Sequence, residues 1–107
     1  MKDERVHLRF ILQAAEKIIR YSADLDFKMF AENEEKQSAI IMQLVVIGEL
    51  AKRLSEKEKT KVPLPWEQIA GFRNMAVHEY FKLDLGKIWK TIQDDIPHLI
   101  KESKSYL

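Results

Sequence analysis

The chain has 107 residues, no cysteine, and 18 Lys and Arg residues against 17 Asp and Glu residues, which give a net charge of +1. A chain of this length forms one domain, expected to cover residues 1–107. The balanced charge excludes nucleic-acid binding through bulk positive charge, so any potential that attracts RNA must be local to a site. The absence of cysteine excludes a disulfide framework and a thiolate metal site, and it fits a reducing compartment.

Membrane and export signals are missing from the sequence. The longest apolar run covers residues 44–47, far short of the roughly 20 residues that a membrane span needs. The first five residues lack the apolar segment of a signal peptide. We therefore expect a cytoplasmic protein with no membrane partner.

The first part of the chain predicts a long helix and a short one. Helix is favoured throughout, because the chain has only three glycines and three prolines and no β-type alternation. The first helix is expected over residues 3–22, with Asp3 as a plausible N-cap. After a break at residues 24–26, Asp26 can cap a short helical turn over residues 27–31.

A second long helix is expected over residues 35–55, and it is apolar on two sides. One side must face the core, and we infer that the other faces a second copy of the chain. Gly48 lets a neighbouring backbone approach closely, although it costs about 1 kcal/mol in helix propensity. The charged run that follows, residues 55–61, is interpreted as a solvated loop or helix end.

The second half of the chain predicts two further helices. Residues 62–65 form an extended connector, and a third long helix begins at Pro65 or Trp66 and continues to Lys82. Asp84 caps the last helix, which Pro97 kinks or restarts. The tail, residues 101–107, is expected to fray. The pattern predicts an all-α, up-and-down bundle of four to five helices.

The most informative stretch, residues 71–80, lies in the third long helix. At about 100° per residue, Arg73, Asn74, His78 and Tyr80 fall within an arc of roughly 160°. They bring a fixed cation, an amide, an imidazole and a phenol to one side of the helix. Phosphodiester chemistry needs groups of these kinds.

These residues also carry a family resemblance. Arg73-Asn74-x-x-x-His78-x-Tyr80 matches the R-x4-H-x-Y signature of the HEPN superfamily, and the chain more closely resembles the HepT-like ribonucleases. These are the toxin half of the HepT/MntA toxin–antitoxin pair. The resemblance runs from Asp3 to about Leu99, and further matching pieces cover residues 25–27, 47–53, 65–69, 88–89 and 95–97.

Each candidate residue has a chemical role in RNA cleavage. His78 can act as base or acid near neutral pH, and Arg73 can pair with two phosphoryl oxygens. Asn74 can orient the imidazole or bind a phosphate oxygen, and Tyr80 can bind phosphate or stack near a base. Glu49, a carboxylate within an apolar stretch, needs a partner, and we expect it to position Arg73.

The resemblance implies an assembly and a switch. One helix supplies one histidine, and a symmetric dimer would supply a second. HepT-like proteins form such dimers with a composite cleft, and they cleave RNA without metal. Their motif tyrosine, matching Tyr80, is AMPylated by a MntA-like nucleotidyltransferase antitoxin. We expect no cofactor, and no metal, because no H-E-x-x-H motif exists.

Other interpretations stay open at this point. The chain could be a catalytically silent helical binding module, a partner subunit of a nucleotidyltransferase that keeps the fold and the dimer. It could also be a purely structural bundle in which Arg73 is a surface cation and His78 is structural.

Overall fold

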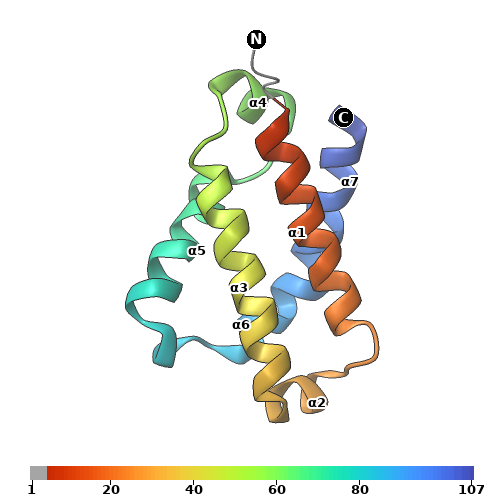
Figure 1. Ribbon diagram of the computed structural model, residues 1–107, viewed down its shortest axis with the longest axis vertical. Helices are drawn as coiled ribbons and strands as arrows, with labels where there is room; N and C mark the ends of the chain where they lie inside the picture. Colours follow the sequence, from red (N-terminus) through yellow and green to blue (C-terminus); the bar gives the residue numbers. More distant parts are fainter. Residues whose placement is uncertain (1–4) are drawn as a thin grey trace.

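Every regular element over residues 5–107, the part of the chain that the computed structural model describes, is helical. The long helices run up and down (Figure 1), and the absence of strands over residues 5–107 confirms the predicted all-α fold class. The elements in order are α1 (Val6–Ser22), α2 (Phe27–Glu32), α3 (Glu34–Ala51), α4 (Glu56–Lys61), α5 (Trp66–His78), the 3₁₀-helix η1 (Tyr80–Lys82), α6 (Leu85–Lys90), the π-helical turn η2 (Thr91–Asp95) and α7 (Ile96–Tyr106).

The hydrophobic core lies where α1 packs against α3 and α7. Burying one large apolar side chain there contributes about 1.5–3 kcal/mol, so this contact supplies much of the driving force for folding. None of the helices within residues 5–107 is long and apolar enough to cross a membrane. The largest fully buried apolar side chains are Leu8, Ile11, Ile18, Phe30, Ile40, Ile92 and Val62.

Side-chain caps set several of the helix starts. The backbone N–H of Met29 donates to Asp26 Oδ1 at 2.8 Å, as expected for the start of α2. Asp84 Oδ1 likewise accepts from two backbone N–H groups at the start of α6, which confirms the predicted cap. The predicted cap Asp3 lies outside the described residues.

One expected helix boundary and the interpretation of the charged run are wrong around α4. The second long helix ends at Ala51 rather than Ser55. Ser55 instead caps α4 through a capping box with Glu58, and the Glu58 side chain is buried at 2% exposure. The charged run is therefore a short packed helix and not a solvated loop, because reciprocal capping stabilises even a brief helix.

The last predicted helix, which begins after Asp84, restarts at Pro97 as predicted. The turn η2 widens to a π-helix just before α7, whose first turn contains Pro97. Proline lacks the N–H that a continuous helix would need at this point. The expected fraying of residues 101–107 is wrong, because α7 continues to Tyr106 and packs along α1 with Ser103 buried.

Helix α5 packs along α3 at one edge of the molecule (Figure 1). Gly48 permits this contact. A Cβ atom at Gly48 would lie 2.8 Å from Arg73 Cβ and 3.0 Å from the carbonyl oxygen of Ile69. The neighbouring backbone that Gly48 admits is therefore α5 of the same chain, at the first residue of the motif.

Candidate functional site

The motif helix is shorter than the sequence predicted. Helix α5 ends at His78, and Glu79 leaves the helical conformation with φ −134° and ψ 39°. Tyr80 then lies in the 3₁₀-helix η1. The chain must turn here to reach the extended residues Leu83 and Asp84, and a 3₁₀ turn is a common way to end a helix tightly. The arc computed for one continuous helix therefore does not apply to Tyr80.

The Arg73 guanidinium is held against α3 by a carboxylate. Its Nε atom lies 2.9 Å from Glu49 Oε2, and Arg53 Nη2 lies 3.9 Å from Glu49 Oε1. Glu49 Oε2 is buried and accepts no well-aligned hydrogen bond within residues 5–107, so the contact with Arg73 is a close ion pair. The structure thus brings together the two residues whose pairing the sequence suggested.

The Asn74 side chain is engaged by two cations. Its Oδ1 atom accepts from Lys52 Nζ at 3.1 Å and from Arg73 Nη1 at 3.2 Å. No hydrogen bond joins the side chains of Asn74 and His78 within the described part of the chain, so the amide does not orient the imidazole here. The amide nitrogen Nδ2 remains as the donor that Asn74 can offer to a phosphate oxygen.

His78 and Tyr80 lie on the exposed end of this region. His78 is the last residue of α5 and is exposed. Tyr80 is 49% exposed, and its hydroxyl lies 3.4 Å from Ser38 Oγ on α3. Either oxygen of that pair can donate, and the contact is long, so the Tyr80 hydroxyl is only weakly held.

Three contacts between side chains align the motif along α3. In order they are Lys52 with Asn74, Glu49 with Arg73, and Ser38 with Tyr80. Tyr80 meets the beginning of α3 and Arg73 meets its end, because the two segments are antiparallel. We call this strip of α3, α5 and η1 the motif face. On the motif face, Arg73, Asn74 and Tyr80 contact side chains of the α3 segment. His78 lies between Asn74 and Tyr80 in the sequence.

Sequence reasoning missed two members of the motif face. Lys52 follows Glu49 by three residues and so shares its helix side, a spacing that could have suggested a role. Ser38 carried no signal, because its contact with Tyr80 depends on the 3₁₀ turn that the sequence did not reveal.

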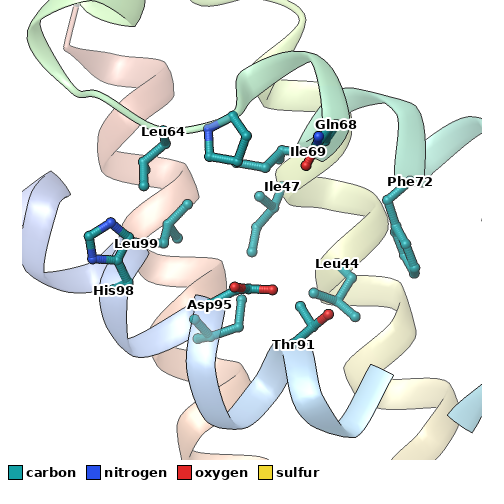
Figure 2. A pocket seen from close by; sticks show the side chains of 12 residues that line it. Leu44, Ile47, Leu64, Gln68, Ile69, Phe72, Thr91, Asp95, His98 and Leu99 are labelled. Atoms are coloured by element: carbon teal, nitrogen blue, oxygen red, sulfur yellow. The ribbon is translucent and has the colours of Figure 1, made fainter. Parts of the chain in front are cut away.

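A separate cavity lies on another side of α5. It measures about 290 Å³ and is lined mainly by apolar side chains of α3, α5 and α7, including Leu44, Ile69 and Leu99. Figure 2 shows Asp95 and His98 among the side chains that line it. Neither Arg73 nor His78 lines this cavity, so it is distinct from the motif face. Over residues 5–107 no three His, Cys, Asp or Glu side chains group in a way that could hold a metal ion.

Comparison with known proteins assigns the family. A family model described as Ribonuclease HepT-like matches residues 11–106. A Methanocaldococcus jannaschii protein named "Putative RNase MJ1380" is 32% identical over 102 residues, covering 94% of both chains. A Caldanaerobacter subterraneus subsp. tengcongensis protein named "Putative RNase TTE0752" is 36% identical over 108 residues, covering 100% of this chain and 96% of its own length.

A third relative, from Thermococcus cleftensis, is named "Probable ribonuclease HepT" and is 32% identical over 99 residues, covering 92% of this chain and 90% of its own. No solved structure matches the chain. These matches extend over nearly all of the sequence, and the range of the family model spans the positions of the four motif residues. The chain belongs to the HepT-like ribonuclease family.

Proposed function

We propose that this protein is a metal-independent RNA endonuclease in which Arg73 and His78 act on the scissile phosphodiester. Membership of a ribonuclease family supports RNA cleavage as the activity. One observation carries the assignment of residues: Arg73 is anchored by Glu49 and Asn74, while the His78 imidazole lies exposed within one and a half turns of the same helix. A fixed cation and an accessible acid–base group on one helix are the kinds of group that the reaction requires.

The chemistry uses the nucleophile that RNA itself carries. His78 takes the proton of the 2′-hydroxyl, the 2′-oxygen bonds to phosphorus, and the bond from phosphorus to the 5′-oxygen breaks. The products are a 2′,3′-cyclic phosphate and a 5′-hydroxyl, whose oxygen receives a proton from a second acid. Arg73 stabilises the charge on the phosphoryl oxygens, a contribution typically worth 10²–10³ in rate, and proton transfer adds roughly 10²–10⁴.

A homodimer would supply the second acid as the partner copy's histidine. Exposed apolar side chains close to the motif support this arrangement. Phe81 is 83% exposed, and Val77 and Met42 are also exposed on α5 and α3. A second copy packed over them would remove this apolar surface from water and bring two motif faces together.

The toxin role and its switch form the regulatory part of the proposal. The Tyr80 hydroxyl is accessible and weakly held, so a nucleotidyltransferase antitoxin could attach AMP to it. The added phosphate would place negative charge and volume on the motif face, and it would repel the phosphate of a substrate.

A cleavage assay tests the proposed function. Purified protein, shown by intact mass to carry no modification on Tyr80, is incubated with labelled RNA and with DNA in EDTA. We expect wild type to cleave RNA and not DNA, and His78→Ala to abolish cleavage. His98→Ala is the matched control, since it removes an exposed imidazole from the separate cavity. Unmodified wild type that leaves RNA intact would refute the proposal and favour a silent partner subunit.

A further inference from the structure

The positive charge of this nearly neutral chain gathers at one end of the motif face. Ion pairs and hydrogen bonds connect five side chains in series: Arg53 to Glu49, Glu49 to Arg73, Arg73 to Asn74, and Asn74 to Lys52. We call this group the cation cluster. It contains three cations and one carboxylate, whereas the whole chain has a net charge of only +1. The rest of the molecule is therefore net negative, and the local positive potential that RNA binding needs lies here.

The cation cluster lacks enough anions to satisfy it. Lys52 Nζ and Arg73 Nη1 both donate to the single neutral oxygen of Asn74, at 3.1 and 3.2 Å. This shared acceptor holds two positive charges close together, and an amide carries no charge to offset their repulsion. Glu49 is already engaged by both arginines. An anion that contacted Lys52 would relieve the repulsion, and phosphate suits a lysine ammonium.

Lys52 reaches across the helix pair rather than toward its own helix end. A lysine at a helix C-terminus is often explained by its favourable interaction with the helix dipole. Here the Lys52 ammonium instead donates to Asn74 on α5, and its side chain stays exposed. Asn74 precedes His78 by four residues, which is about one helical turn, or roughly 5.4 Å along the axis. The residue that Lys52 contacts therefore lies about one helical turn before His78.

We propose that Lys52, with Arg53 beside it, binds the phosphate next to the scissile one on the bound RNA strand. This inference rests on the proposed ribonuclease function and adds a second phosphate position to it. The contact carries no base recognition, so it contributes affinity that is independent of sequence and sensitive to salt.

A binding experiment with an uncleavable probe tests the inference. The probe is a fluorescein-labelled single-stranded RNA with 2′-O-methyl groups throughout, and its anisotropy is followed as salt is raised. For Lys52→Gln we expect binding to weaken on the order of fivefold at low salt and the slope of log K against log salt to fall by about 0.7. The loss should be equal for uridine and adenosine probes. Lys52→Arg should restore binding.

Lys101→Gln provides the matched control, because it removes the same charge from an exposed position on α7, which packs along α1. Two outcomes would overturn the proposed phosphate contact of Lys52: Lys52→Gln binds the probe as tightly as wild type, or Lys101→Gln loses as much affinity as Lys52→Gln. Neither outcome would affect the ribonuclease proposal. If wild type binds the probe through Lys52 but does not cleave RNA, the ribonuclease proposal is refuted and the phosphate contact of Lys52 is retained. In cleavage, Lys52→Gln should raise KM and leave kcat within about twofold; a fall in kcat alone would mean that Lys52 only positions Asn74.

Discussion

Replacing Gly48 with alanine tests how closely α3 must approach α5 for the motif to work. The new Cβ would lie 2.8 Å from Arg73 Cβ and 3.0 Å from the Ile69 carbonyl oxygen, where ordinary contacts begin near 3.4 Å. Helix α5 must therefore move away by roughly 0.6 Å, the difference between 2.8 Å and 3.4 Å. The displacement falls on Arg73 itself, whose Nε lies 2.9 Å from Glu49.

The stability cost of Gly48→Ala should be small, because two effects oppose each other. Forcing an extra methyl group into a packed contact costs about 1–3 kcal/mol, while alanine gains about 1 kcal/mol in helix propensity over glycine. We expect a net loss of about 0–2 kcal/mol in the free energy of unfolding. The loss of activity should be larger, about 10- to 100-fold in kcat, because small displacements of a catalytic group are costly.

Chemical denaturation and steady-state RNA cleavage, measured on the same samples, separate these effects. Gly71→Ala is the matched control: it makes the same chemical change on α5, where a Cβ would meet nothing within 4 Å. It should raise the free energy of unfolding by about 1 kcal/mol and leave kcat unchanged. A Gly48→Ala protein that is as active as wild type would show that the close approach does not set the position of Arg73.

Three further changes probe the motif and its supports. Glu49→Gln removes the charge that holds Arg73 and should lower kcat about tenfold with a stability change within about 1 kcal/mol; unchanged kcat would mean that the ion pair is incidental. Asp84→Ala removes the cap of α6 and should cost about 1 kcal/mol in urea denaturation, whereas a null effect would mean that water replaces the cap fully. Tyr80→Phe should keep the stability of wild type, since its hydroxyl has only a 3.4 Å contact. After co-expression with a nucleotidyltransferase its mass should show no added AMP, and any AMP found would place the modification elsewhere.

The features that the sequence predicted correctly are those that depend on a side chain and its near neighbours in the chain. The caps Asp26 and Asp84 and the restart at Pro97 were visible because each depends on the side chain present and on its immediate neighbours. The short helix α4 was missed, although Ser55 and Glu58 have the spacing of a capping box that could have predicted it. The high charge of that run favoured a solvated loop instead, and the buried carboxylate of Glu58 shows that charge alone does not decide exposure.

The end of the motif helix could not be predicted in this way. Residues 79–82 contain no glycine or proline, so nothing local ends α5 at His78. The tertiary path ends it, because the chain must turn toward the start of α6. The partner of Asn74 was hidden for a related reason. Periodicity places Asn74 and His78 on one side of α5, but only the packing of α3 shows that Lys52 takes the amide oxygen.

The two proposed catalytic groups are held to different degrees. Consecutive residues of α3 fix both ends of the Arg73 side chain, since Gly48 admits its Cβ and Glu49 pairs with its guanidinium. His78 has neither kind of support: it ends its helix and is exposed, and its imidazole makes no hydrogen bond within residues 5–107. Electrostatic stabilisation is therefore built into one chain, whereas the imidazole must be oriented by substrate or by a second copy. For the proposed dimer, dilution below its dissociation constant should thus lower the cleavage rate per chain far more than it weakens binding of RNA to the cation cluster.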